Sequence, residues 1–273
     1  MKKEITILTG RIGSGKDFEC EENLKESDKY FRLKFATPMK IAANEIFTGI
    51  DIEDRANKNK LFEIDVNHFI KIGYNSFINL LKLEKTNENY EYFMSFFKEY
   101  VKDDIINISP RIYQQVFGNY VARGIDDEIF IKTLKDEAKD VVQNHIYITD
   151  GRYVNEVNNV ASLSKENFNV TVKYILKYKL ENGVYKTFNE NIDYHESEEM
   201  NNNLERVGLE ALNRNDFSII ENHIKQTFDK NINFVYMAKE WVEKISLDYI
   251  EDRIPKILYE SETSKSKKKI KIS

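Results

Sequence analysis

The sequence predicts an α/β fold with a five-stranded parallel sheet, and three observations favour this class. Short apolar segments rich in β-forming residues alternate with longer segments of helical spacing, the order that produces parallel strands covered on both faces. A glycine-rich loop follows the first apolar segment almost at once. The chain has 273 residues, of which 41% are hydrophobic, enough to build one large core with an insertion.

The expected strands and helices follow one another along the chain. The expected strands are Ile5–Leu8, Tyr30–Phe35, His145–Thr149, Val170–Leu176 and Phe217–Ile220. The expected helices between them are Asp17–Lys25, Lys40–Phe47, Tyr113–Val121 and Phe130–Val141. We therefore assign residues 1–50 and 109–230 to the core that contains the sheet.

Other intervals do not fit simple connections between strands and helices. Residues 51–108 hold two helical patterns, Val66–Leu83 and Tyr90–Val101, and are expected to form a helical insertion. Residues 178–196 contain Gly183 and many polar residues, so we expect them to leave the sheet as a lid or binding loop. After the core we expect a helical extension at 231–263 and a disordered, lysine-rich tail at 264–273.

Charge and cysteine content exclude several classes of protein. The net charge of −5 argues against strong nucleic-acid binding, which usually needs a basic surface. Cys20 is the single cysteine, so neither a disulfide framework nor a zinc site built on thiolates is expected. The N-terminus reaches glycine before any signal-length apolar run, and no later segment approaches about 18 apolar residues. We expect a soluble, cytoplasmic protein without membrane attachment.

The stretch ILTGRIGSGKDFEC, residues 7–20, is typical of a phosphate-binding loop. Gly10, Gly15 and Lys16 have the spacing of the G-x-x-x-x-G-K motif, but Asp17 replaces the usual Ser or Thr. In such a loop the backbone N–H groups and the following helix N-terminus converge on one anion, and the lysine adds positive charge. The residues expected to bind a nucleoside triphosphate are Arg11, Ile12, Gly13, Ser14, Gly15, Lys16, Asp17 and Phe18.

Two carboxylates are candidates for organising Mg²⁺. Asp17 stands where the motif normally has a metal-binding hydroxyl, and a carboxylate can hold the same ion directly or through water. Asp150 follows the expected strand His145–Thr149, at the edge of a parallel sheet where ligands bind. The alternatives are that Asp17 only favours the first turn of a helix and that Asp150 only occupies a turn before Gly151.

Arginine is scarce in this lysine-rich chain, with nine among 41 basic residues. Arg11, Arg55, Arg111 and Arg152 fall in segments that resemble ligand sites. A guanidinium group presents a planar pair of donors that matches phosphate oxygens, so these four are expected to contact phosphate. The alternative for each one alone is a solvated surface residue.

Six motifs resemble, in the same order, those of the bacteriophage deoxynucleoside monophosphate kinases. They are GRIGSGKD (residues 10–17), FATPMKIAANEIF with Pro38 and Lys40, FTGIDIEDR ending at Arg55, PRIYQQVFG with Arg111, Gln115 and Gly118, DGRYVNE with Asp150, Arg152 and Glu156, and HESE with His195, Ser197 and Glu198. The resemblance covers roughly residues 1–230. In that family an aspartate after the lysine is usual, which accounts for Asp17.

The resemblance implies the P-loop fold of nucleoside monophosphate kinases, with 51–108 as a helical substrate-binding insertion and 178–196 as a lid. It implies phosphoryl transfer from ATP, with Mg²⁺, to a deoxynucleoside monophosphate. The implied catalytic residues are Lys16, Asp17, Arg111, Asp150 and Arg152, with Asp17 and Asp150 serving the metal. The implied acceptor-binding residues are Lys40, Arg55, Arg111, Gln115, Phe130 and Glu156, and Lys177 and His195 belong to the lid. The alternative for Glu156 is that it orients Arg152.

The sequence departs from the family at two positions, where Phe18 replaces a common Thr and Lys177 replaces a favoured Arg. Phe130 has core packing as its alternative to stacking on a base. The expected partners are ATP and a deoxynucleoside monophosphate, with a homodimer as a further option. The expected location is the cytoplasm, or the host cytoplasm if a phage encodes the chain.

Three other functions stay open. One is a kinase of another small acceptor, since a Ser-Gly-Lys-Asp loop also occurs in one class of phosphomevalonate kinase. Another is a nucleotide hydrolase or switch, although the guanine-reading Asn-Lys-x-Asp element is absent. The third is a non-catalytic nucleotide-binding protein, which the unassigned region 231–273 leaves open.

Overall fold

The computed structural model describes residues 2–11, 13–188, 198–229, 232–240 and 269–272. The chain forms two compact units, one made by Met1–Arg32 with Val141–Ser273 and the other by Leu33–Asp140. The second unit takes in more of the chain than the predicted insertion 51–108, because residues 33–50 and 109–140 also belong to it. Helices that flank the insertion in sequence, α2 (Thr37–Ile46) and α6 (Pro110–Gln115), pack with its helices and with each other.

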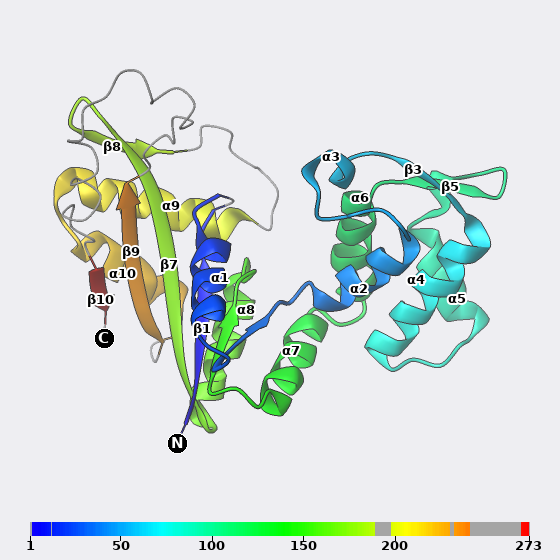
Figure 1. The fold of residues 1–273 in the computed structure, drawn as a ribbon, viewed down its shortest axis with the longest axis horizontal. Coiled ribbons are helices and arrows are strands. Elements are labelled where there is room, and N and C mark those ends of the chain that lie inside the picture. The colour runs from blue at the N-terminus through cyan, green and yellow to red at the C-terminus, as the bar shows by residue number, and fades with distance from the viewer. Residues whose placement is uncertain (1, 12, 189–197, 230–231, 241–268, 273) are drawn as a thin grey trace. The chain divides into compact units, whose positions relative to one another are not determined.

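The first unit is built on a mostly parallel sheet (Figure 1). Its strands are β1 (Lys3–Thr9), β2 (Tyr30–Leu33), β6 (His145–Ile148), β7 (Phe168–Glu181), β8 (Val184–Thr187), β9 (Asn233–Glu240) and β10 (Lys269–Ile272). The strand order is β10-β9-β7-β1-β6-β2, and β8 pairs with β7 outside this path. The α/β class is therefore confirmed.

The orientation of the strands is mixed, which corrects the prediction of a purely parallel, five-stranded sheet. β1 is parallel to β6 and β7, and β7 is parallel to β9. β8 and β10 are antiparallel to their neighbours, and the sheet has seven strands within the described residues. The register aligns fully buried side chains across the centre, such as Ile5 with Ile146 and Val172 with Phe234.

The C-terminal part of the sheet differs from the sequence prediction. Phe217–Ile220 is not a strand, because Ser218–Thr227 forms helix α10 and buries Ile220 and Ile224 one turn apart. The strand beside β7 is instead β9, inside the segment 231–263 that was expected to be a helical extension. Lys269–Ile272, expected in a disordered tail, pairs with β9 as β10. The remaining residues of both segments, apart from Ile232, lie outside the described part of the chain.

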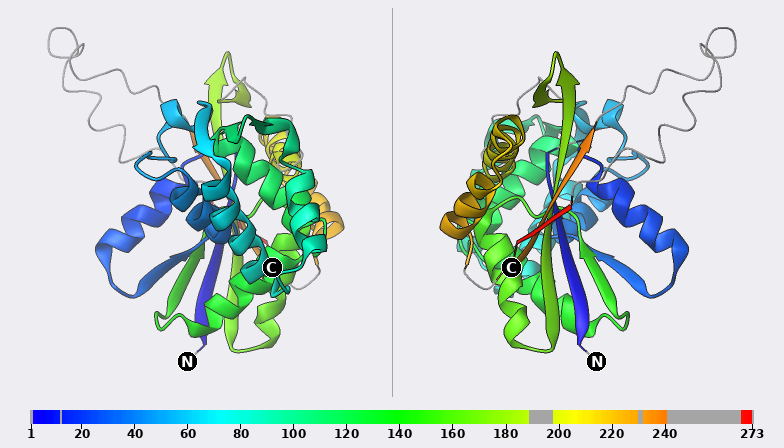
Figure 2. Two further views of the ribbon diagram at one scale, coloured as in Figure 1. Left: turned by 90° about the vertical axis from the view of Figure 1, so that its right-hand side faces the viewer. Right: turned by 90° about the vertical axis from the view of Figure 1, so that its left-hand side faces the viewer.

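Helices cover both faces of this sheet. They are α1 (Lys16–Glu26), α8 (Val154–Ala161), the 3₁₀ turn η3 (Ser162–Lys165), α9 (Glu199–Arg214) and α10 (Ser218–Thr227). Figure 2 shows α1 on one side of strands β1 and β7, and α9 and α10 on the other side. Cys20 of α1 is fully buried in a cluster with Leu8, Tyr147 and Ile175, so the single cysteine packs as a small apolar side chain.

The second unit combines a small antiparallel sheet with helices. Its strands are β3 (Phe62–Asp65), β4 (Val101–Lys102) and β5 (Ile105–Ile108). Its helices are α2, α3 (Arg55–Lys58), α4 (Val66–Leu81), α5 (Asn87–Ser95), η1 (Lys98–Tyr100), α6, the π-helix η2 (Val116–Ala122) and α7 (Ile129–Asp140). The two helical patterns expected inside 51–108 correspond to α4 and α5.

Aromatic packing and helix caps explain why this second unit folds as it does. Phe69, Phe93 and Phe97 are fully buried, with ring centroids 5.0–6.1 Å apart, and they form the centre of its core. Asp65 and Thr86 cap α4 and α5 by accepting hydrogen bonds from backbone N–H groups in the first turn.

A partly buried ion cluster connects α1 to the sheet of the first unit. The Glu19 carboxylate pairs with Lys173 of β7 and, at 3.1 Å, with Lys239 of β9. Burial by itself raises the pKa of Glu19, but the hydrogen bonds and charges of the two lysines outweigh it and hold the pKa below its ordinary value of 4.5. The ionised carboxylate is therefore favoured by folding.

We predict that this cluster makes the protein sensitive to acid. A depressed folded-state pKa gives stability that is present above about pH 4.5 and is lost as the pH falls through the lowered pKa. Glu19→Gln should flatten that part of the stability curve, measured by urea unfolding between pH 6 and pH 3. Glu22→Gln on the same helix removes only an exposed pair with Lys25 and serves as the control. Identical acid profiles for the parent and Glu19→Gln would contradict the cluster's role.

Candidate functional site

The glycine-rich loop joins β1 to α1 in the first unit. Gly10, Gly13 and Gly15 have φ values of 147°, 83° and 92°, in the region that favours glycine. A Cβ atom on Gly10 would lie 2.7 Å from both the Ile175 carbonyl oxygen and Ser14 Oγ. The sequence G-x-x-G-x-G is therefore what allows the chain to turn here, and α1 begins directly after the loop with its N-terminus at Lys16. Ile12 lies outside the described residues.

Lys16 bends back over the loop. Its Nζ atom donates to the Gly10 carbonyl oxygen at 3.2 Å and to the Arg11 carbonyl oxygen at 3.4 Å. Burial lowers the pKa of Lys16, and the charge of Arg152 acts in the same direction, while Asp17, Glu198 and Asp150 act to raise it. Burial thus disfavours the charged form of this ammonium group, and an incoming anion would stabilise that form.

Asp17 pairs with Arg32, an arginine that lies outside the predicted site motifs. The Asp17 carboxylate pairs with Nη2 of Arg32, and Arg32 Nε also donates to Thr149 Oγ1 at 3.0 Å. Arg32 thus links the start of α1 to the end of β6. In the sequence, the only sign of this role is that Arg32 is an arginine inside the predicted strand Tyr30–Phe35. Its contact with Thr149 depends on the pairing of β2 with β6, which the sequence does not reveal.

Two carboxylates near Lys16 suit a magnesium ion carried by a nucleotide. Asp17 is more than half exposed, and both Asp17 and Asp150 act electrostatically on Lys16. Among the described residues no group of three or more Asp, Glu, His or Cys side chains could hold a metal by itself. Mg²⁺ keeps several waters and usually takes only one or two carboxylates together with phosphate oxygens, so these residues fit the ion.

Arg152 follows β6, in the turn before α8, and two buried carboxylates hold it. Glu156 Oε2 accepts hydrogen bonds from the backbone N–H groups of Arg152 and Tyr153, at 2.8 and 3.2 Å. Glu198, at the start of α9, places Oε1 3.0 Å from Arg152 Nη1. Arg152 therefore has an anchored backbone and a guanidinium group that pairs with Glu198, and its side chain is 44% exposed.

Glu156 is part of the protein's own framework in this arrangement. Its side chain is only slightly exposed and caps the N-terminus of α8. The sequence offered two roles for Glu156, contacting the acceptor or orienting Arg152, and its contacts with the backbone of the Arg152 turn agree with the second.

The Arg11 side chain is buried and contacts α9 and β8. Arg11 Nη1 lies 2.6 Å from Glu205 Oε2 of α9 and 3.1 Å from Thr187 Oγ1 of β8, and both charged side chains are less than 10% exposed. The prediction that Arg11 contacts phosphate through its guanidinium is therefore wrong for this conformation, because Glu205 already compensates its buried charge. The backbone of Arg11 still belongs to the loop.

Asn201 of α9 was not predicted and makes direct contact with the loop. Its Oδ1 atom accepts the Gly10 N–H at 3.0 Å and lies 2.7 Å from the hydroxyl of Thr9, which is also 3.1 Å from the Gly151 carbonyl oxygen. These contacts join the ends of β1 and β6 to α9. Nothing in the sequence near Asn201 distinguishes it from the two asparagines that follow it.

The first part of the predicted lid, residues 178–187, forms the β7–β8 hairpin and stays in the sheet, which corrects the prediction that it leaves the sheet there. Lys177 Nζ donates to the Gly13 carbonyl oxygen at 3.2 Å and lies 5.0 Å from the centre of the Phe188 ring. A Cβ atom on Gly13 would be 3.4 Å from that ring, so Phe188 packs directly on the loop. His195 and the rest of the lid after Phe188 lie outside the described residues.

The other predicted site residues belong to the second unit. Arg111 and Gln115 are four residues apart on α6 and share one face, directly before the π-helix η2. π-Helical segments occur frequently at functional sites. Gly118 lies within η2, and a Cβ atom on it would be 2.5 Å from Met39 Sδ, so only glycine leaves room for Met39 there. Lys40 Nζ pairs with Glu53 Oε1 at 2.5 Å.

The structure describes the side chain of Phe130 but not that of Arg55. Phe130 is 1% exposed, and the guanidinium carbon of Arg123 lies 5.3 Å from the centre of the Phe130 ring. Phe130 therefore packs in the core and does not present a face to a base. This contradicts the predicted role in substrate binding and agrees with its alternative. Arg55 begins α3, after the cap Asp54, and its side chain lies outside the described part of the structure.

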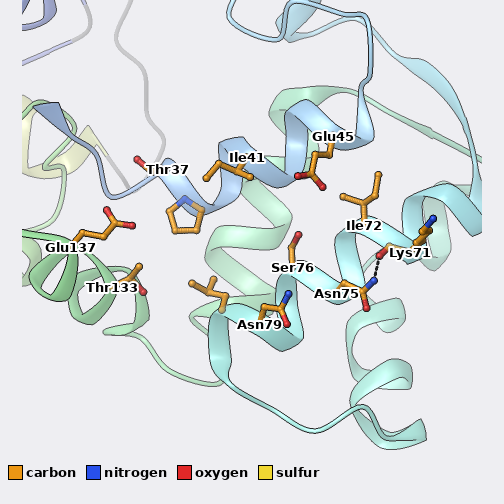
Figure 3. A pocket seen from close by; sticks show the side chains of 12 residues that line it. Thr37, Ile41, Glu45, Lys71, Ile72, Asn75, Ser76, Asn79, Thr133 and Glu137 are labelled. Carbon is orange, nitrogen blue, oxygen red and sulfur yellow. Dashed lines mark hydrogen bonds between the residues drawn. The ribbon is translucent and has the colours of Figure 1, made fainter. Parts of the chain in front are cut away.

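A cavity of about 550 Å³ opens between α2, α4 and α7 of the second unit (Figure 3). Its lining includes Glu45, Asn75, Asn79 and Glu137, and burial raises the pKa of Glu137. None of the predicted site residues lines this cavity. Its lining mixes polar side chains with apolar ones such as Ile41, Ile72 and Leu80, and no residue of α6, which carries Arg111 and Gln115, takes part in it.

Comparison with known protein families and with curated proteins finds no match for this chain. In the described part of the chain, no helix has the length and apolar character needed to cross a membrane.

We predict that the Arg11 side chain stabilises the folded protein through its buried pair with Glu205. Arg11→Met should lower the free energy of unfolding by about 3–5 kcal/mol, because it leaves the Glu205 carboxylate buried without its partner. Arg214→Met removes a surface pair with Glu210 on α9, the helix that also carries Glu205. It should change the free energy of unfolding by less than about 0.5 kcal/mol. Urea unfolding measures both variants. If Arg11→Met keeps its stability but loses nucleotide binding, the guanidinium is a ligand contact after all.

Proposed function

We propose that this protein transfers the terminal phosphoryl group of ATP to a deoxynucleoside monophosphate, on a P-loop kinase fold with a helical insertion and a lid. The observation that carries the proposal is the convergence of three features in the first unit. These are a glycine loop with positive φ values, the desolvated ammonium of Lys16, and the anchored guanidinium of Arg152.

The position of the loop in the sheet supports the proposal. β1 lies between β6 and β7, and the chain visits β2 and β6 on one side of it before crossing to β7 and β9 on the other. α1 covers one face, while α9 and α10 cover the opposite face (Figure 2). In open parallel sheets, ligands bind at the carboxyl ends of the strands where the order reverses, and the glycine loop occupies that point.

The donor would be held by the loop and Lys16. The loop N–H groups and the N-terminus of α1 favour an anion, and Lys16 would exchange its contacts to the loop carbonyls for phosphate oxygens. Mg²⁺ bound with ATP would be held by Asp17 and Asp150 and would neutralise phosphate charge. Asp17 would have to give up part of its pairing with Arg32 in this state.

Phosphoryl transfer depends mainly on alignment and on neutralising charge at the moving group. Arg152 suits that task, because its guanidinium pairs with Glu198 while its side chain is 44% exposed. The family resemblance assigns the acceptor to residues of the second unit, with Arg111 for phosphate, Gln115 for a base edge, and Lys40 and Arg55 as further contacts. These acceptor roles stay predictions.

The direct test is product analysis with the full chain. ATP and Mg²⁺ are mixed with each deoxynucleoside monophosphate in turn, and the products are separated by anion-exchange chromatography. We expect at least one acceptor to yield its diphosphate together with an equal amount of ADP. Lys16→Met should slow the reaction about 100- to 1000-fold, since it removes charge that the transition state needs. Lys25→Met, an exposed lysine on the same helix, should leave the rate unchanged.

Other outcomes identify the alternatives. ADP formed without any acceptor product indicates a hydrolase. A diphosphate product only with phosphomevalonate indicates the other kinase class. Nucleotide binding without turnover for any common, hydroxymethylated or ribonucleotide acceptor indicates a binding protein, and each of these results would overturn the proposal.

A further inference from the structure

Three buried polar side chains form a row on α9 and its N-cap. Glu198, Asn201 and Glu205 are spaced three and four residues apart, so they lie on one face of the helix. Their residues are 3%, 2% and 7% exposed. Buried carboxylates and amides are costly unless each has a partner, so a row of three indicates that α9 contacts polar groups along its length.

Each member of this row contacts a different part of the phosphate-binding machinery. Glu205 pairs with Arg11 at 2.6 Å, and Asn201 accepts the Gly10 N–H at 3.0 Å. Glu198 pairs with Arg152 at 3.0 Å. One rigid helix therefore fixes both the start of the glycine loop and the arginine that follows β6.

Glu198 is the member that acts on a group proposed to touch the substrate. Its side chain is 4% exposed, whereas that of Arg152 is 44% exposed, so the pair extends from the protein interior toward solvent. Glu156 already fixes the Arg152 backbone, and a charge-assisted hydrogen bond to Glu198 restricts the rotamers of the side chain. Restricting a long side chain before binding reduces the entropy lost in the transition state.

We propose that Glu198 is a positioning residue for phosphoryl transfer, which holds the guanidinium group of Arg152 beside the glycine loop. This inference rests on the proposed function. It gives Glu198, the last residue of the HESE segment, a role toward Arg152. It also makes α9 the element that aligns the glycine loop with Arg152. Glu198 itself does not touch the substrate in this account.

Steady-state kinetics with four proteins test the assignment: the parent, Glu198→Gln, Arg152→Lys and the double variant. Glu198→Gln should lower kcat by about 10- to 100-fold, the range expected for loss of a hydrogen bond to a charged group, and should change the KM for ATP less than about twofold. In the Arg152→Lys background the same change should have little further effect, because the group to be positioned is gone. Equal fold losses of kcat in both backgrounds would overturn the proposal.

The matched control is Glu210→Gln, which removes an exposed pair with Arg214 from the same helix and should leave kcat unchanged. Thermal melts accompany every variant. If Glu198→Gln does not fold, Glu198→Asp replaces it, since it keeps the charge but shortens the reach, and it should lower kcat in the parent background but not in that of Arg152→Lys.

A measurement that needs no activity separates this inference from the proposed function. Phenylglyoxal modifies guanidinium groups, and mass spectrometry follows the reaction at Arg152. Arg152 should react severalfold faster in Glu198→Gln than in the parent or in Glu210→Gln, because the ion pair no longer restrains it. Equal rates would contradict the positioning contact even in an active kinase, whereas faster labelling in a chain without transfer activity would reject only the proposed function.

Discussion

The attachment of the glycine loop to α9 is the interaction on which the candidate site depends. The loop needs backbone conformations that only glycine adopts readily, and such a segment keeps one shape only if its surroundings fix it. The buried Arg11–Glu205 pair and the contact of Asn201 with the Gly10 N–H provide that support. Because the same helix also pairs with Arg152 through Glu198, one element positions both the glycine loop and Arg152.

Most of the fold could be predicted, because its central strands and helices have clear local patterns. Four expected strands correspond to β1, β2, β6 and β7, and the expected helices correspond to α1, α2, α6 with η2, and α7. The fifth expected strand, Phe217–Ile220, is a short apolar run, which cannot be assigned by periodicity alone. In the protein it is part of a helix whose next buried residue is Ile224, and the strand is formed by Asn233–Glu240 instead. The lysine-rich composition near the C-terminus also concealed the alternation Lys-Ile-Lys-Ile that forms β10.

The candidate site could be predicted only where its chemistry is local in sequence. The motif identified Lys16 and the loop because glycine spacing and a following helix are sufficient signals. It assigned the wrong role to the Arg11 side chain, whose partner Glu205 lies 194 positions away. Asn201 and Glu205 could not be recognised, since polar residues on an amphipathic helix look like a solvated face until the packing is known. Phe130 shows the same limit for an aromatic residue, because sequence alone does not distinguish stacking on a base from burial in a core.

The central claim, that α9 holds the loop in its anion-binding shape, is tested most directly by calorimetric titration of ATP and Mg²⁺ into Asn201→Ala. The parent should bind the nucleotide, and the variant should bind it about tenfold more weakly while remaining folded, because the Gly10 N–H loses its buried acceptor. Asn203→Ala, two positions along the same helix, should bind like the parent. Unchanged affinity in a folded Asn201→Ala protein would contradict the account.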